Sequence, residues 1–149
     1  MTALDTLDTP VVLWSEVTTD PLDTAAARAR VASAASGAVV VFEGVVRDHD
    51  DGRRVTMIEY EGHPSADEVM RAAAEAVAAR HPALTGMVVL HRLGPLQIGD
   101  AALVVAVASP HRAEAFAGCA AVVDEVKRVL PVWKRQVFAD GSDEWVNCP

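Results

Sequence analysis

The sequence is short of aromatic residues, cysteine and long apolar runs, and each shortage excludes a class of protein. Three Trp, three Phe and one Tyr among 149 residues leave a core built mainly from Val, Ala and Leu. The two cysteines, Cys119 and Cys148, form neither a disulfide framework nor a zinc site. We expect Cys119 to be a small core residue and Cys148 to be an exposed thiol without a catalytic role. No apolar run approaches the roughly 20 residues of a membrane helix. The start of the chain lacks the features of a signal peptide, so we expect no membrane association and a cytoplasmic location.

Positive charge is also scarce, yet it is concentrated in one segment. The chain has 13 Lys and Arg against 21 Asp and Glu, a formal net charge of −8, which argues against a general nucleic-acid or anionic-membrane binder. Residues 127–135 (KRVLPVWKR) nevertheless contain four cations. A positive cluster on a negative protein indicates a site that holds a specific anion.

The pattern of apolar runs and turn signals predicts the fold class. Hydrophobic residues make up 51% of the chain, which suits one domain over residues 1–149 with a flexible leader at 1–9. Strands are expected in adjacent pairs separated by single helices, which predicts an α+β fold with a mostly antiparallel sheet covered by helices. The expected strands are 11–17, 38–46, 55–60, 87–93, 101–108, 132–138 and 144–146, and the expected helices are 21–36, 66–80 and 110–130.

Three local features make this prediction more specific. The unbroken apolar run 38–46 is expected to be a central strand covered on both faces, joined to strand 55–60 as a hairpin-type pair. Ser65 and Glu68 fit a capping box at the start of the second helix. Ser109 is expected to cap the third helix.

Lys127 occupies an unusual position for a charged residue. Taking 100° per residue, it falls near the middle of an apolar stripe on the third helix. An ammonium group on a buried face must be paired, reach solvent or lose its proton. We expect a partly desolvated lysine with a lowered pKa, suited to proton transfer; matching of a cation to the helix C-terminus is the alternative. The stripe consists of Phe116, Cys119, Ala120, Val123, Val126 and Leu130.

Two further groups of cations could hold an anion. Arg47 follows the strand 38–46 and could grip a phosphate or carboxylate with two hydrogen bonds, although a polar turn over 47–51 would explain the same residues. The acidic spacing there matches no calcium loop. His111 and Arg112 lie at the start of the third helix, where the positive end of the dipole favours an anion; a tolerated surface pair is the alternative.

Strand and helix geometry limit which cations can share one pocket. Neighbouring residues on a strand point to opposite faces, so only one of Lys134 and Arg135 can join Lys127, and Lys134 is the better candidate. Alternatively, Lys134 and Arg135 lie on an edge strand, where their charges prevent pairing with another chain. His111 and Lys127 are about 24 Å apart along one helix, since each residue rises about 1.5 Å. They therefore serve separate sites or meet across a homodimer.

Several short segments form an ordered set between about residues 37 and 146. These segments are 42–49 (FEGVVRDH), 91–94 (HRLG), 99–100 (GD), 109–112 (SPHR), 127 followed by 131–135 (K, then PVWKR), and 145–146 (WV). Together they resemble the large, catalytic subunit of molybdopterin synthase, and the combination is specific although no single motif is.

The resemblance implies an α/β-hammerhead, α+β fold and a sulfurtransferase. Two large subunits form a homodimer, and a small ubiquitin-like sulfur-carrier subunit docks at each end to complete a heterotetramer. The carrier's thiocarboxylated C-terminus enters the large subunit's pocket. Sulfur passes to cyclic pyranopterin monophosphate and forms the dithiolene of molybdopterin, with no metal or redox cofactor implied for the large subunit.

The same resemblance assigns the site residues. Lys127 and Lys134 match the family's essential lysines, and Arg47 matches its anion-binding arginine. His111 and Arg112 match a pair that reaches across the dimer. The individual roles of the two lysines and the order of the two sulfur transfers stay open.

The chain departs from the family pattern in two places. Gln136 stands where the family often has an acidic residue, so a contact to a lysine is expected to be missing. The sequence stops at Pro149, whereas many relatives continue with a charged tail. The alternative function is a non-catalytic, anion-binding dimer that docks a ubiquitin-like tail. A third interpretation is a structural dimer whose basic cluster pairs with its own acidic surface.

Overall fold

The computed structural model describes residues 11–148, with side chains as far as Val146, so the expected leader at 1–9 lies outside the described part. Within residues 11–148, nine strands occur in groups separated by three helices. They are β1 (Val12–Thr18), α2 (Thr24–Val31), β2 (Ala38–Val45), β3 (His49–Asp50), β4 (Arg53–Gly62), α3 (Ala66–Arg80), β5 (Gly86–Arg92), β6 (Gly94–Gln97), β7 (Ala101–Ser109), α4 (Arg112–Val129), β8 (Val132–Phe138) and β9 (Asp143–Cys148).

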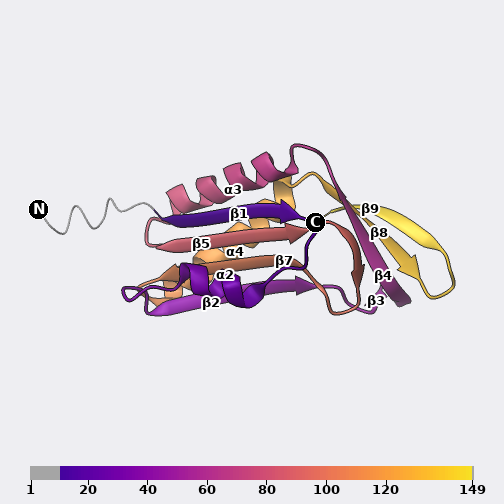
Figure 1. Ribbon diagram of the computed structural model, residues 1–149, viewed down its shortest axis with the longest axis horizontal. Coiled ribbons are helices and arrows are strands. Elements are labelled where there is room, and N and C mark those ends of the chain that lie inside the picture. The colour runs from indigo at the N-terminus through magenta and orange to yellow at the C-terminus, as the bar shows by residue number, and fades with distance from the viewer. Residues whose placement is uncertain (1–10, 149) are drawn as a thin grey trace, which may run out of the picture.

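The strands form two sheets that meet at one end of the molecule (Figure 1). The first sheet has the order β1-β5-β7-β2; β7 is antiparallel to both neighbours, and only β1 and β5 are parallel. The second sheet has the order β3-β4-β8-β9, with β6 also beside β4, and all its pairs are antiparallel. The predicted α+β class with mostly antiparallel sheets is confirmed.

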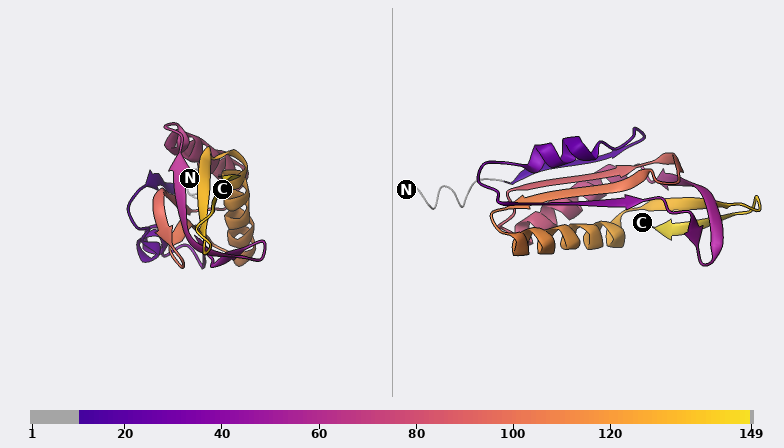
Figure 2. Two further views of the ribbon diagram at one scale, coloured as in Figure 1. Left: turned by 90° about the vertical axis from the view of Figure 1, so that its right-hand side faces the viewer. Right: turned by 90° about the horizontal axis from the view of Figure 1, so that it is seen from below.

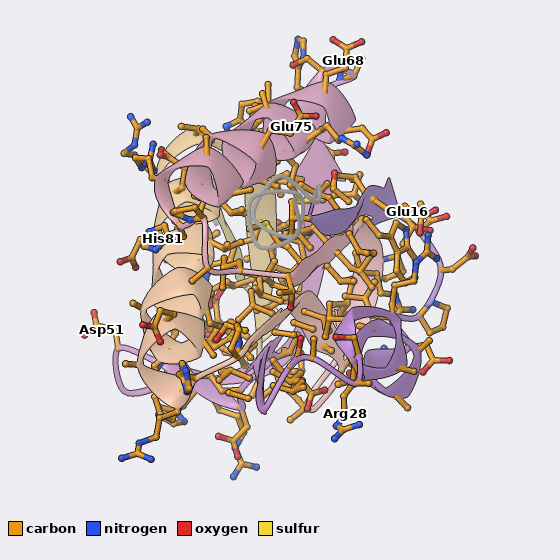
Figure 3. The ribbon with its side chains drawn as sticks, turned by 90° about the vertical axis from the view of Figure 1, so that its left-hand side faces the viewer. Glu16, Arg28, Asp51, Glu68, Glu75 and His81 are labelled. Atoms are coloured by element: carbon orange, nitrogen blue, oxygen red, sulfur yellow. The ribbon has the colours of Figure 1, made fainter. Side chains whose placement is uncertain are left out.

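Helices cover both faces of the first sheet (Figure 2). α2 lies on one face, and α3 and α4 lie side by side on the other. The strand β7 runs through the middle, and its residues from Ala102 to Ser109 are buried, which explains its uninterrupted apolar sequence. Charged and polar side chains such as Glu16, Arg28 and Glu75 point outward around this core (Figure 3). Within the described residues, no helix combines the length and the apolar character that crossing a membrane requires.

Two strand predictions for the segment 38–46 are wrong. β2 is an edge strand of the first sheet, and it pairs with β7, far along the chain, instead of with β4. Only the two-residue strand β3 pairs with β4 at that turn. The prediction failed because α2 and α4 pack on the two faces of β2. An edge strand that is covered on both faces has the same uninterrupted apolar sequence as a central strand.

The boundaries of α3 and α4 lie close to the predicted 66–80 and 110–130. α2 is shorter than the predicted 21–36, because Asp23 caps its start and the backbone is extended at Ala32.

The caps of α3 and α4 also differ from the predicted ones. α3 follows Ser65, yet the Ser65 side chain makes no capping bond and its hydroxyl lies 2.8 Å from His63 Nδ1. α4 has His111 at its N-cap, while the Ser109 hydroxyl donates to the His111 carbonyl at 2.5 Å. Ser65 is the N-cap residue, as predicted, but the predicted capping box is wrong because its side chain makes no capping bond; the predicted cap at Ser109 is wrong. A capping side chain needs an extended backbone, whereas Ser65 has helical angles (φ −84°, ψ −1°), and α4 has its N-cap at His111, two residues after Ser109.

The buried face of α4 includes Cys119 and Val126 of the predicted stripe but is turned away from Phe116 and Ala120. Its buried residues include Ala115, Gly118 and Val122, whereas Phe116 is 62% exposed. A Cβ on Gly118 would lie only 2.7 Å from the Leu84 side chain, so small residues let this face pack closely. Lys127 lies outside the buried face and is exposed, so the predicted desolvation of its ammonium group is wrong for the single chain.

Candidate functional site

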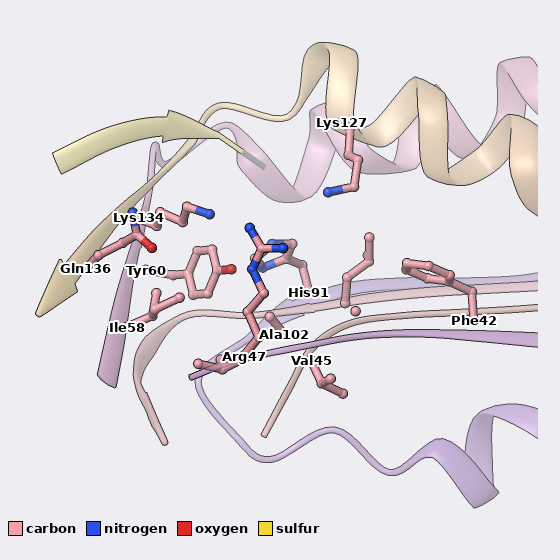
Figure 4. A pocket seen from close by; sticks show the side chains of 13 residues that line it. Phe42, Val45, Arg47, Ile58, Tyr60, His91, Ala102, Lys127, Lys134 and Gln136 are labelled. Carbon is pink, nitrogen blue, oxygen red and sulfur yellow. The ribbon is translucent and has the colours of Figure 1, made fainter. Parts of the chain in front are cut away.

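A pocket of about 300 Å³ lies where the two sheets meet (Figure 4). The ends of β2, β5 and β7 form its floor, β4 and β8 of the second sheet form one wall, and α4 contributes Lys127 from above. Its lining residues are Phe42, Gly44, Val45, Val46, Arg47, Ile58, Tyr60, His91, Ala102, Leu103, Lys127, Lys134 and Gln136.

The register of β4 and β8 decides which cation of the Lys134-Arg135 pair reaches this pocket. Lys134 lies directly opposite Tyr60, and both side chains line the pocket. Arg135 lies opposite Glu59 on the other face of the sheet. There it forms ion pairs at 3.3 Å with Glu59 and with Asp143, which raise the pKa of Arg135. The sequence-based choice of Lys134 for the pocket is confirmed.

Three cations from separate elements converge on the pocket. Arg47 follows β2, Lys127 comes from the last turns of α4 and Lys134 from β8, and Figure 4 shows their nitrogen atoms directed toward one space. Among the residues that line it, all of them in the described part of the chain, none is acidic. Three like charges around one hollow raise the local positive potential, so an anion is the favoured occupant.

Arg47 is held by a hydrogen-bonded carboxylate. Its Nη2 donates to Asp50 Oδ1 at 3.1 Å, and Gln136 Nε2 donates to the other oxygen of Asp50 at 2.9 Å. The hydrogen bond from Gln136 is the largest of the effects that lower the pKa of Asp50, with the Arg47 hydrogen bond and the charges of Arg47 and Lys134 adding to it. Gln136 is 3% exposed, so its amide is a fixed donor. At the position where a contact to a lysine is expected to be missing, Gln136 instead donates this hydrogen bond to Asp50.

Sequence reasoning missed a pair of rings in the pocket. His91 is 1% exposed and meets Tyr60 edge to face, with ring centroids 5.1 Å apart. Burial, with a smaller effect from the charge of Lys127, lowers the pKa of His91 to about 4, against the opposing effect of the hydrogen bond to Arg92. The Nδ1 of this neutral imidazole lies 2.9 Å from the Arg92 carbonyl oxygen, so Nδ1 carries the proton and Nε2 is an acceptor. Only the spacing of residues 91–94 within the matched segments could have indicated this role.

The predicted residues His111 and Arg112 do not reach this pocket within one chain. They lie at the N-terminal end of α4, whereas Lys127 lies near its C-terminal end. Of the five predicted site residues, the structure therefore brings together three, and it places two at the other end of a long helix.

Other reactive groups give no second chemical centre in the described part of the chain. No group of three or more His, Cys, Asp or Glu residues there is arranged to hold a metal ion. Cys119 is buried, as predicted, and burial raises the pKa of its thiol to about 11, so it is no nucleophile near neutral pH. The side chain of Cys148 lies outside the described residues.

Comparison with known proteins agrees with the matched segments. The model of the MoaE protein family matches residues 17–129, which is most of the chain. The chain belongs to the MoaE protein family. The molybdopterin synthase catalytic subunit of Nostoc sp. is 39% identical over 132 residues, covering 88% of this chain and 80% of the relative. The molybdopterin synthase catalytic subunit of Staphylococcus carnosus is 37% identical over 133 residues, which cover 89% of this chain and 87% of the relative.

Solved structures give the same result for the fold. The crystal structure of molybdopterin synthase from Staphylococcus aureus superposes with a TM-score of 0.82 at 32% identity, covering 89% of this chain and 96% of the other. A complex of subunits 1 and 2 of the molybdopterin-converting factor from Helicobacter pylori has a TM-score of 0.67 at 18% identity, which supports the fold alone. The resemblance of this MoaE-family chain to molybdopterin synthase catalytic subunits is therefore confirmed.

Proposed function

We propose that this chain is a single-domain catalytic subunit of a molybdopterin synthase. It transfers sulfur from the thiocarboxylated C-terminus of a small ubiquitin-like carrier to cyclic pyranopterin monophosphate, and so forms the molybdopterin dithiolene. The observation that carries this proposal is the pocket itself, where Arg47, Lys127 and Lys134 surround a hollow with no acidic lining residue in the described chain.

The charge of the pocket suits both reactants. Cyclic pyranopterin monophosphate carries a phosphate, and the thiocarboxylate of the carrier is a second anion. Bringing two anions together is unfavourable unless cations neutralise their repulsion. Arg47 can hold the phosphate with two hydrogen bonds, and the lysines then face the reacting carbon and sulfur atoms.

The two lysines supply the proton transfers. Sulfur addition at carbon and opening of the cyclic phosphate both require protons to move, and an amine held beside the reacting atoms can carry them. We assign that role to Lys127, with Lys134 stabilising the negative charge that develops. Lys127 is exposed in the single chain, so a carrier tail that enters the pocket would cover it and reduce its contact with water.

A homodimer would complete the site. A groove of about 390 Å³ between β2 and α4 is lined mainly by apolar residues, including the exposed Phe116. Phe42 lines both this groove and the cationic pocket, so the two hollows adjoin. A second copy seated on the groove can bring its own His111 and Arg112 to the pocket and add two groups that bind anions.

We place this dimer at the centre of a heterotetramer in the cytoplasm. Each pocket would receive the C-terminal tail of one small carrier subunit. The exposed edge of β2, which has β7 on one side only, lies beside the dimer groove and offers backbone groups to a second copy.

One reconstitution tests the function. The purified chain is mixed with a thiocarboxylated carrier and cyclic pyranopterin monophosphate, and the dithiolene product is measured. We expect product formation that depends on the chain. A folded dimer that binds a competent carrier and yields no dithiolene would contradict the enzymatic function and favour the non-catalytic docking module.

A further inference from the structure

Asp50 connects the two sheets at the mouth of the pocket although it does not line the pocket. One of its oxygens accepts from Arg47, which follows β2, and the other accepts from Gln136 on β8. The side chain of Arg47 is 67% exposed, so little packing fixes its position. A long, exposed arginine samples many rotamers unless a partner orders it.

We propose that Asp50 is a positioning residue, which holds the Arg47 guanidinium at the pocket mouth while Gln136 holds Asp50. The inference rests on the proposed function for the role of Arg47 as the phosphate-binding cation. Gln136 suits this role because it is buried, so its amide donates to Asp50 from a fixed place. Asp50 thereby orders Arg47 before substrate arrives, which lowers the entropic cost of binding.

The hydrogen-bonded pair at positions 50 and 136 should carry one negative charge and not two. The carboxylate of Asp50 lies near the charges of Arg47 and Lys134, and both favour its ionised form. A second carboxylate at position 136 would face the first and repel it. Exchanging the two groups, in D50N/Q136E, keeps an amide oxygen at position 50 as an acceptor for Arg47. It also keeps a hydrogen bond between positions 50 and 136, with the charge at the opposite end.

The test compares wild type, D50N, Q136E and D50N/Q136E. In each variant the order of the Arg47 guanidinium is read from its ¹⁵N–¹H resonances, whose Nη signals separate only when rotation about the Cζ–Nε bond is slow. Substrate KM and kcat are measured alongside. D51N is the matched control, since Asp51 is exposed on the same turn and Asn tolerates its φ of 50°.

We expect separate Arg47 signals in wild type and D51N and their loss in D50N and Q136E. Each single variant should raise KM about threefold to fivefold with kcat within about twofold, as for a partly exposed ion pair. D50N/Q136E should restore both the signals and KM. The inference is overturned if D50N leaves the signals unchanged, if D50N lowers KM, or if the exchange is no better than D50N alone.

The resonance measurement separates this inference from the function. If wild type makes no dithiolene with a competent carrier, the proposed function fails, while the Arg47 signals still decide whether Asp50 positions that side chain. A thermal unfolding curve for each variant confirms that it is folded, and signals are compared only among folded variants.

Discussion

Tyr60 and His91 meet edge to face in the pocket, with their ring planes at 80° to one another. Tyr60 comes from the second sheet and His91 from the first, so their rings form a contact between the two sheets. The same contact buries the His91 imidazole beside the cationic groups of the pocket. A ring in that place stays neutral, because a further positive charge would be both desolvated and repelled.

We predict that His91 makes the stability of the fold depend on pH. Its pKa is about 4 in the folded chain against an ordinary value of 6.5. Between these values the unfolded chain binds a proton that the folded chain does not, so stability falls as the pH falls from 6.5 toward 4. The expected loss across this window is about 3 kcal/mol.

Urea unfolding at pH 7 and pH 4.5 measures this effect in wild type, H91Q and H63Q. The loss of stability at the lower pH should be clearly smaller in H91Q. H63Q, which removes an exposed imidazole, should behave as wild type does. An equal loss in wild type and H91Q would show that the buried ring is not responsible.

We predict that two inactive variants complement each other. K127A and R112A each remove one residue of a shared site, and a mixed dimer would contain one site with both residues intact. After unfolding and refolding together in equal amounts, the mixture should recover about a quarter of wild-type activity, because half the dimers are mixed and each has one complete site. Activity no higher than that of the separate variants would place both residues in the same chain's site or in none.

We predict that F116E separates the dimer without unfolding the monomer. Phe116 is 62% exposed in the single chain, and a carboxylate in the apolar groove would have to be desolvated when a second copy docks. Analytical ultracentrifugation should show a monomer with near-wild-type circular dichroism and little activity. I98E, which changes an exposed apolar residue outside that groove, is the control and should remain dimeric. A dimeric, active F116E would contradict the proposed interface.

We predict that G118V destabilises the fold by about 1–3 kcal/mol, because added methyl groups would overpack the contact of α4 with Leu84. A117V, on the exposed side of the same helix, has the same β-branched side chain and should cost less than about 1 kcal/mol. Denaturant unfolding of both variants measures the difference. A G118V variant as stable as wild type or more stable would contradict the packing requirement at Gly118, because Val has a higher helix propensity than Gly.

The sequence predicted the cations of the site better than their surroundings. Lys127 stood out because charge that interrupts an apolar stripe is unusual, while Arg47 and Lys134 were selected with the help of the match to the family, and the structure brings all three together. Tyr60 had no signal in the sequence and His91 was indicated only as part of the matched segment 91–94, since their contact depends on how two sheets cross. That arrangement arises from pairings between strands distant in sequence, such as β4 with β8.

The prediction for α4 failed for a different reason. Apolar residues lie on more than one side of this helix, so periodicity alone could not decide which side is buried. The packing against Leu84 selects the side with Gly118, and Phe116 is left exposed beside β2. Lys127 was expected to be buried because the wrong face of α4 was taken as the buried one. It still reaches the pocket, because it lies near the C-terminal end of the helix.

The central claim is that the amine of Lys127 takes part in sulfur transfer, and K127A tests it most directly. With thiocarboxylated carrier and cyclic pyranopterin monophosphate, dithiolene formation should fall by about 10²–10⁴-fold, while the carrier Kd stays within about threefold of wild type. R128A, which removes the adjacent exposed cation paired with Glu125, should keep near-wild-type activity. Dithiolene formation by K127A at the wild-type rate, or a loss of activity fully explained by weaker carrier binding, would contradict the claim.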